Sequence, residues 1–170
     1  MSYWTGKRIL VTGGAGFIGS YLVEQLVHRG GIVRVADNLA TGRMENLAAV
    51  ENDVEFLRLD LRDMDQALKA CEGQEIVLNL AAKITGIGYS EAHHAEMFET
   101  NMLLQQNPIN AACRCGAEKF CQVSSACVYP GDALVPTPEM EGQRGEPESG
   151  GDADRVHRGR AEAVAAVAGV

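Results

Sequence analysis

Positive charge is scarce in this chain of 170 residues, which has 15 Lys and Arg against 23 Asp and Glu and a formal net charge of −8. Such a balance offers no electrostatic footprint for nucleic acid or for an anionic membrane surface, so we expect neither as a partner. The sequence also has no apolar run of the length that a membrane span needs. An anionic ligand would then be held by local backbone dipoles.

We also expect no export signal. The chain runs from Met1 to Lys7 directly into an apolar stretch, without the cleavage site of a signal peptide. Five cysteines, an odd number, favour reduced thiols over a disulfide framework, so we expect a cytoplasmic protein. Cys113, in a helical segment, and Cys121, in a strand, fit no strong zinc spacing; we expect small buried side chains and no metal site.

Glycine, by contrast, is concentrated where it predicts chemistry. The run Val11 to Gly19 follows an apolar stretch and opens a segment with apolar residues at helical spacing. Gly13 can take the tight turn, Gly16 lets the backbone approach phosphates, and Gly19 allows close packing of the helix. Because the helix N-terminus faces the anion, this strand, turn and helix predict a site for a dinucleotide pyrophosphate.

An acidic residue follows at the spacing that a dinucleotide site needs. Residues 32–36 predict a second strand that ends at Asp37, where a carboxylate accepts the ribose hydroxyls of NAD. The same carboxylate would repel a 2′-phosphate, which favours NAD over NADP, although Arg34 and Arg43 leave NADP open. The structural alternative is that Asp37 only caps a turn with Asn38.

Strands and helices alternate along the rest of the chain. We expect strands at 54–59, 75–80 and 119–123, a short helix through Met64 that stops at Gly73, and a helix near 92–115 that Pro108 kinks or breaks. This order predicts an α/β fold with a Rossmann-like, doubly wound parallel sheet of about five strands, incomplete at its C-terminal end.

The character of the chain changes after Pro130. Residues 131–170 predict an irregular loop rich in Pro and Gly, followed by a divergent tail. We therefore expect residues 1–130 to form an NAD-binding domain, and we expect no C-terminal substrate lobe.

Five segments together resemble the extended short-chain dehydrogenase/reductase family of NAD-dependent epimerases and dehydratases. They are residues 12–19, 37–38, 60–63, 79–82 and 124–130. Within that family, residues 81–88 and 124–130 are most similar to the GDP-mannose 3,5-epimerases and GDP-fucose synthases. The resemblance implies a Rossmann fold, NAD as cofactor and a nucleotide sugar, here a GDP-sugar, as substrate.

The resemblance also implies roles for single residues. Ser125 would hydrogen-bond the reacting sugar oxygen, and Cys127 matches a thiol that moves a proton at a sugar carbon beside a transient ketone. A buried side chain at a strand end is the alternative for Cys127. The implied cofactor residues, with Asp60 and Leu61 at the adenine, are Gly13, Gly16, Phe17, Ile18, Gly19, Asp37, Asn38, Asp60, Leu61, Leu80, Ala81, Ala82 and Lys83.

One motif of the family is missing from its expected place. The family uses Tyr-x-x-x-Lys on the helix after the fifth strand, but the last tyrosine here is Tyr129 and the last lysine is Lys119. We therefore expect the NAD-binding portion of a nucleotide-sugar epimerase or dehydratase, catalytically incomplete. The alternatives are a non-catalytic regulatory module that binds a dinucleotide, or a second polypeptide that supplies the pair. An unpaired edge at the fifth strand predicts self-association.

Overall fold

A computed structural model describes residues 2–85, 89, 92–125 and 128–144. The chain divides into two compact units. The first consists of Met1–Ala82 and Leu103–Val123, and the second consists of Lys83–Met102 and the described residues from Ser124 onward. The predicted domain boundary near residue 130 stays a prediction.

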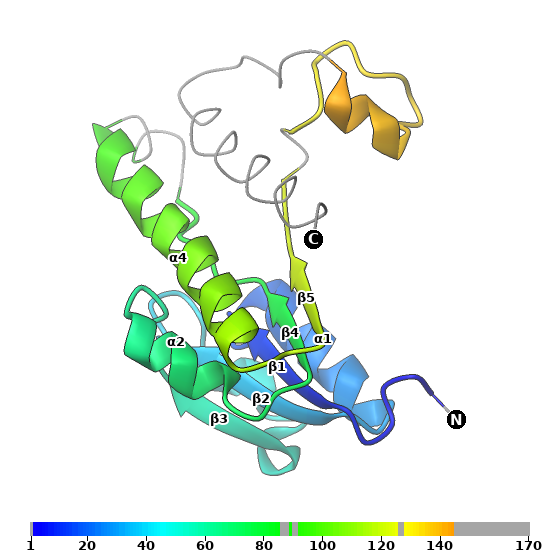
Figure 1. Cartoon of the computed structure of the whole chain (residues 1–170), viewed down its shortest axis with the longest axis vertical. Coiled ribbons are helices and arrows are strands. Elements are labelled where there is room, and N and C mark those ends of the chain that lie inside the picture. The colour runs from blue at the N-terminus through cyan, green and yellow to red at the C-terminus, as the bar shows by residue number, and fades with distance from the viewer. Residues whose placement is uncertain (1, 86–88, 90–91, 126–127, 145–170) are drawn as a thin grey trace. The chain divides into compact units, whose positions relative to one another are not determined.

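The first unit is built on a parallel sheet of five strands in the order β3-β2-β1-β4-β5, which confirms the predicted fold class (Figure 1). The strands are β1 Arg8–Thr12, β2 Ile32–Asp37, β3 Val54–Arg58, β4 Ile76–Asn79 and β5 Lys119–Gln122. The helices are α1 Phe17–His28, α2 Met64–Cys71 and α4 His94–Arg114. Thr12 of β1 pairs with Ala36 on one side and with Asn79 on the other, so the carboxyl ends of these strands share one edge.

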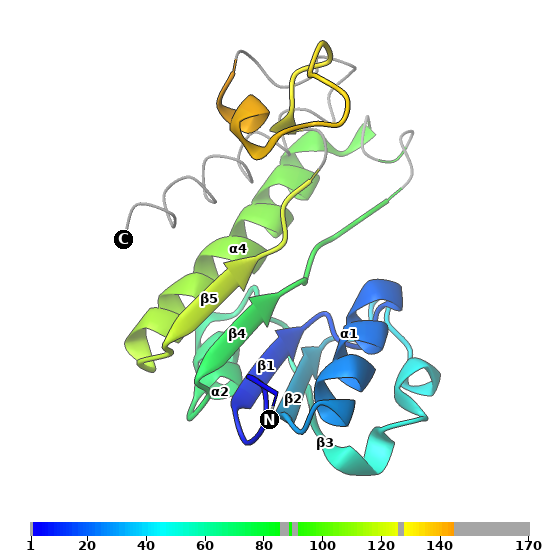
Figure 2. The same ribbon diagram turned by 90° about the vertical axis from the view of Figure 1, so that its right-hand side faces the viewer.

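Both faces of the sheet are covered at its central strands β1, β2 and β4, which explains why these strands are mostly apolar at successive positions. Ile9 of β1 belongs to a buried cluster with Val23 of α1. The next residue, Leu10, belongs to a second cluster with Ala67 of α2 and Ala111 of α4. Figure 2 shows α1 on one side of the sheet and α2 and α4 on the other. The two-sided packing is that of a doubly wound fold.

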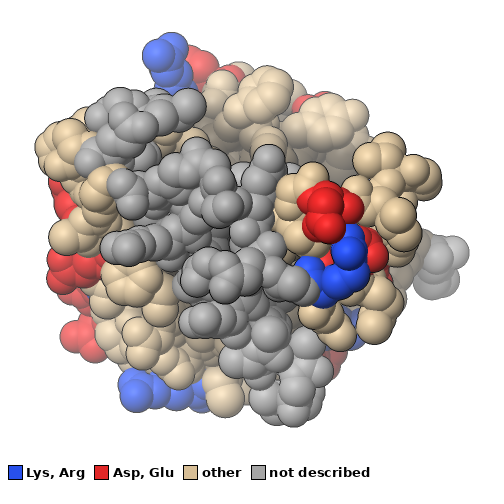
Figure 3. Space-filling model, turned by 90° about the horizontal axis from the view of Figure 1, so that it is seen from above, with Lys and Arg blue, Asp and Glu red and all other residues tan. Residues whose placement is uncertain are grey.

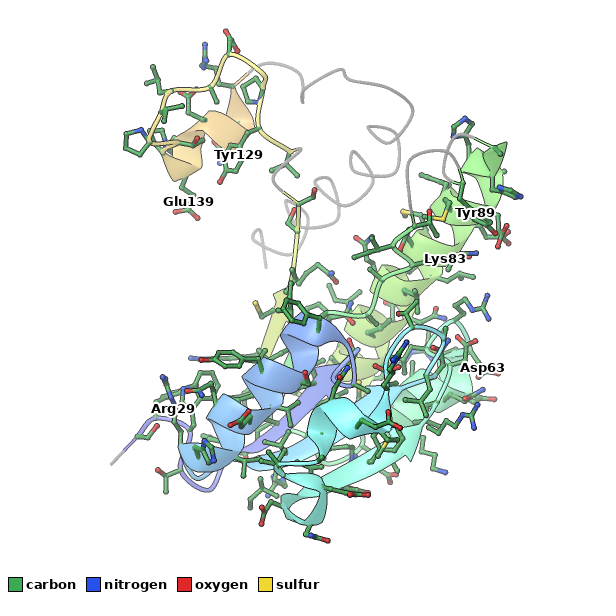
Figure 4. All side chains as sticks on the ribbon, turned by 180° about the vertical axis from the view of Figure 1, so that it is seen from behind. Arg29, Asp63, Lys83, Tyr89, Tyr129 and Glu139 are labelled. Carbon is green, nitrogen blue, oxygen red and sulfur yellow. The ribbon has the colours of Figure 1, made fainter. Side chains whose placement is uncertain are left out.

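Helix α2 begins and ends where the sequence predicts. Asp63 caps its N-terminus by accepting hydrogen bonds from the backbone N–H groups of Asp65 and Gln66 (Figure 4). Gly73 follows the helix with a φ of 72°, in the left-handed region that glycine enters without strain.

Of the kink or break that the sequence predicts at Pro108, the break does not occur, because α4 continues through this residue. Proline lacks the N–H that would bond the carbonyl of Leu104 four residues earlier. That carbonyl instead accepts a hydrogen bond from the Asn79 side chain, with 3.0 Å between Nδ2 and O. The lost helix bond is therefore replaced from strand β4, a compensation that helical periodicity does not reveal.

Asn79 joins three elements at the carboxyl edge of the sheet. The residue is fully buried. Its Nδ2 also donates to Oε1 of Gln122 in β5 at 2.7 Å, and its Oδ1 accepts from the hydroxyl of Thr12 in β1. Buried polar groups are costly unless they are paired, so this paired amide fixes the relative positions of β1, β4, β5 and α4.

The cysteines lie in the predicted elements, but the predicted burial of two of them is wrong. Cys113 in α4 and Cys121 in β5 are both exposed. Phe120 packs with the cluster of α2 and α4, which places Cys121 on the opposite face of β5. Cys71 is buried instead, and burial raises the pKa of its thiol to about 12.

The second unit contains the start of α4 and a short 3-10 helix, η4 Glu139–Gln143. Arg144 follows η4 and pairs with Glu141 of that helix at 2.9 Å and with Asp132, which precedes the helix, at 3.4 Å. Among the residues that the structure describes, no helix is long and apolar enough to cross a membrane.

Candidate functional site

The turn between β1 and α1 connects three strand ends. Gly13 has a φ of 65°, and its N–H donates to the carbonyl of Ala36 in β2 at 2.8 Å. A Cβ atom at Gly13 would lie 3.1 Å from the Cα of Ala81, just beyond β4. The left-handed backbone and this close approach both require glycine at position 13.

Two further glycines let the turn close on itself. A Cβ atom at Gly19 would lie 2.2 Å from the carbonyl oxygen of Gly13, so the close packing expected at Gly19 is made with the turn itself. A Cβ atom at Gly14 would lie 2.7 Å from Cγ1 of Val35 in β2. No role was predicted for Gly14, although Gly14 begins a Gly-x-Gly-x-x-Gly pattern with Gly16 and Gly19, which is the sequence signal for it.

The N-terminus of α1 is open. Gly16 is its N-cap and provides no side-chain cap, and the first N–H groups of a helix have no partner within the helix. A Cβ atom at Gly16 would meet only the carbonyl oxygen of Gly13, and Phe17 and Ile18 are 92% and 71% exposed. An uncapped helix end with glycine at its entrance can bind an anion. Among the described residues visible in Figure 3, Lys and Arg lie interspersed with Asp and Glu.

Asp37 is buried beside this turn. Its Oδ2 accepts the N–H of Ala15 at 3.0 Å, and its Oδ1 accepts the N–H of Leu39 at 2.8 Å. Asn38 makes a similar turn contact, accepting the N–H of Ala40 at 2.9 Å. The turn-capping alternative is therefore present in the structure. Each carboxylate oxygen keeps a second lone pair, however, so Asp37 can still accept ribose hydroxyls.

Arg34 is one of the two arginines that could favour NADP, but its side chain already makes hydrogen bonds within the protein. Its guanidinium donates to Glu55 at 2.7 Å and to the carbonyls of Ala70 and Glu72 at 3.0 and 2.7 Å. These bonds tie β2 to β3 and to the end of α2. A side chain used in this way is a poor candidate for a phosphate ligand.

Asp60 and Leu61 follow β3. The guanidinium of Arg62 binds the Asp60 carboxylate, with 2.6 Å between Nη2 and Oδ2, and holds the pKa of Asp60 below its usual value. A hydrogen bond from Asn38 acts in the same direction, which links the loop after β2 to this carboxylate. Leu61 is buried, and its carbonyl accepts from Asn107 of α4 at 3.2 Å.

The end of β4 is fixed by Thr12. The Thr12 hydroxyl oxygen accepts the N–H groups of Leu80 and Ala81, both at 3.1 Å. Leu80, Ala81 and Ala82 are only partly buried, and the two alanines present small side chains at this edge. No role was predicted for Thr12. Its sequence signal is that it is a polar residue at the end of an apolar strand.

In the second unit, Lys83 is held by its neighbours. Its backbone N–H donates to Oδ1 of Asn101 at 2.9 Å, and its ammonium pairs with Glu96 and lies 3.5 Å from the Tyr89 hydroxyl (Figure 4). The hydrogen bond to Glu96 raises the pKa of Lys83, so the protonated, positively charged form of this side chain is favoured. Ser125 accepts the N–H of Val128 through its carbonyl at 3.3 Å. Cys127 lies outside the described residues.

The first unit therefore gathers the turn residues Gly13 and Gly16, the carboxylate of Asp37 and the small residue Ala81 at the carboxyl edge of one sheet. No group of three or more His, Cys, Asp or Glu side chains that could hold a metal ion occurs in the described part of the chain.

A parallel sheet of order 3-2-1-4-5, with a glycine turn between its first strand and first helix, defines a Rossmann-like α/β protein. The chain belongs to the NAD dependent epimerase/dehydratase family, whose model matches residues 9–149.

Known relatives agree with this assignment. The chain is 35% identical over 130 residues to a GDP-mannose 3,5-epimerase of Arabidopsis thaliana, covering 75% of this chain and 34% of the relative. It is 37% identical over 127 residues to UDP-glucuronic acid decarboxylase 1 of the same plant, covering 75% and 28%. The solved structure of Thermus thermophilus UDP-glucose 4-epimerase in complex with NAD has a TM-score of 0.75 at 32% identity, covering 95% of this chain and 50% of that one. The chain thus spans about a third of these curated relatives and half of that solved structure.

Proposed function

We propose that the first unit binds NAD at the glycine turn. The observation that carries this proposal is the uncapped N-terminus of α1, where Gly16 leaves room for a ligand and Asp37 is hydrogen-bonded to the turn. The pyrophosphate would lie at the N–H groups of Phe17 and Ile18. Asp37 would accept the ribose hydroxyls, Asn38 with Asp60 and Leu61 would contact the adenosine end, and Leu80, Ala81 and Ala82 would line the far side.

The proposed activity is that of the NAD-binding portion of a nucleotide-sugar epimerase or dehydratase. Bound NAD supplies a hydride acceptor for a sugar carbon. The chain's own contribution would be to hold the cofactor and to exclude water from its phosphates. Similarity to a GDP-mannose 3,5-epimerase supports a GDP-sugar as the substrate. Lys83, Ser125 and Cys127 keep the roles that the family resemblance implies, as part of this proposal.

A second candidate, a regulatory module that binds NAD without chemistry, rests on one sequence fact. Within residues 1–170 no tyrosine follows Tyr129 and no lysine follows Lys119, so residues 123–170 contain no Tyr-x-x-x-Lys. Two further properties stay predictions: a cytoplasmic location, and self-association at β5, which pairs only with β4 among the described strands and leaves Val123 46% exposed.

Cofactor choice tests the role of Asp37. We expect the chain to bind NAD at least about tenfold more tightly than NADP, because a carboxylate beside a 2′-phosphate adds repulsion in a partly desolvated site. Asp37→Asn keeps the size of the side chain and removes its charge, so the preference should narrow. Isothermal titration with both dinucleotides measures this, and equal affinities in the unmodified chain would remove Asp37 from the site.

Turnover separates the two candidates. We expect no epimerase or dehydratase turnover with GDP-mannose, since loss of a principal general acid/base costs about 10²–10⁴-fold in rate. Adding a separately produced C-terminal half of a relative that carries Tyr-x-x-x-Lys should restore turnover if the chain is part of an enzyme. A regulatory module would bind NAD and stay inactive in that mixture, whereas turnover by the chain alone would contradict catalytic incompleteness.

A further inference from the structure

The loop after β2 is attached to the middle of the glycine turn through a single residue, Ala15. The carbonyl of Ala15 accepts the N–H of Arg43 at 3.0 Å and the Nδ2 of Asn46 at 2.8 Å. Its N–H donates to Asp37 at 3.0 Å. Both hydrogen-bonding groups of this buried residue are therefore used by the segment from Asp37 to Asn46.

Close packing supports these bonds. A Cβ atom at Gly42 would lie 3.0 Å from the carbonyl carbon of Ala15 and 2.9 Å from Oδ2 of Asp37. The loop backbone thus lies directly on the peptide that enters the N-cap of α1. Because a peptide group is planar, fixing the Ala15 carbonyl fixes the orientation of the Ala15–Gly16 peptide as well.

We propose that Asn46 is a positioning residue for the cofactor site, which holds the glycine turn in the shape that accepts a pyrophosphate. The inference rests on the proposed NAD site. Arg43 contacts Ala15 through its backbone, so that bond survives any side-chain change. Asn46 contacts the carbonyl of Ala15 through its side chain. The residue lies in the short 3-10 helix η1 Met44–Leu47 and is exposed.

The exposure of Asn46 makes the proposal testable. Substitution of an exposed side chain costs little packing, so a change in ligand binding can be separated from unfolding. Asn46→Asp has nearly the same shape but places an acceptor oxygen against the acceptor carbonyl of Ala15. Asn52 is also an exposed asparagine in a 3-10 helix of this region, η2 Glu51–Asp53, and Asn52→Asp adds the same charge away from the turn.

The experiment measures binding of NAD and of adenosine to the unmodified chain, Asn46→Asp, Asn46→Ala and Asn52→Asp. We expect both Asn46 variants to bind NAD about tenfold more weakly, with adenosine affinity changed by less than about threefold, because the turn contacts the phosphates. Asn52→Asp should match the unmodified chain. Equal losses for NAD and adenosine, or NAD affinity in Asn46→Asp like that of Asn52→Asp, would overturn the proposal.

Hydrogen exchange of the ligand-free chain keeps the two proposals apart. We expect the Ala15 amide, bonded to Asp37, to exchange about tenfold faster in Asn46→Asp and at an unchanged rate in Asn52→Asp. If the unmodified chain does not bind NAD, the proposed function fails while this exchange result still decides whether Asn46 holds the turn. Unchanged exchange at Ala15 would reject the positioning role.

Discussion

Gly16→Val should abolish NAD binding while leaving the sheet and helices in place. A Cβ atom at Gly16 meets only the carbonyl oxygen of Gly13, at 3.1 Å, so the fold can accept the new side chain with a small adjustment. The branched side chain would occupy the entrance to the N-terminus of α1, where a pyrophosphate must approach the backbone. We expect NAD affinity to fall more than about a hundredfold, as measured by isothermal titration.

Gly19→Ala provides the matched comparison. Its methyl group would lie 2.2 Å from the Gly13 carbonyl oxygen and 2.8 Å from the Gly14 Cα, and both contacts are with backbone that cannot move aside cheaply. We expect this smaller substitution to lower the free energy of unfolding by about 3 kcal/mol and to weaken NAD binding too. Circular dichroism and urea unfolding should separate the two variants. NAD affinity of Gly16→Val within threefold of the original would show that the ligand lies elsewhere.

The contrast between these glycines also shows how far the sequence could predict the site. The motif located the turn, and the runs of apolar residues located all five strands to within two residues. The signal is strongest for β1, β2 and β4, which are buried on both faces and mostly apolar. The spacing predicted that Gly16 lets the backbone approach phosphates and that Gly19 allows close packing, but it did not predict that Gly19 packs against the Gly13 carbonyl. That contact depends on the path of the turn between Ala36 and Ala81, which tertiary contacts set.

Features that depend on contacts between distant segments were missed for the same reason. The sequence predicted a kink or a break at Pro108, and the helix is not broken there; local patterns count only the lost N–H and not a donor that arrives from β4. The burial predicted for Cys113 and Cys121 was wrong because periodicity places a residue in an element but does not say whether another element covers that face. Asp37 ends strand β2 as predicted, while its bond to Ala15 was visible only in the structure.

The compensation of Pro108 by Asn79 leads to the other large expected effect. Asn79→Ala removes the hydrogen-bond partner of the buried Thr12 hydroxyl and of two partly buried groups, the Leu104 carbonyl and the Gln122 amide oxygen. An unsatisfied buried polar group costs about 1–3 kcal/mol, so we expect a loss of about 3 kcal/mol or more in the free energy of unfolding. Urea unfolding followed by circular dichroism measures this loss.

A double-mutant cycle then tests whether Asn79 replaces the helix bond that proline removes. Pro108→Ala restores an N–H that can bond the Leu104 carbonyl, so Asn79→Ala should cost about 1 kcal/mol less in that background. The remaining cost of Asn79→Ala comes from its lost hydrogen bonds to Gln122 and Thr12, which the residue at position 108 does not replace. Glu99→Ala, an exposed change on the same helix, should leave the cost of Asn79→Ala unchanged. Strict additivity between positions 79 and 108 would mean that the Leu104 carbonyl gains nothing from Asn79, and that α4 tolerates its proline for another reason.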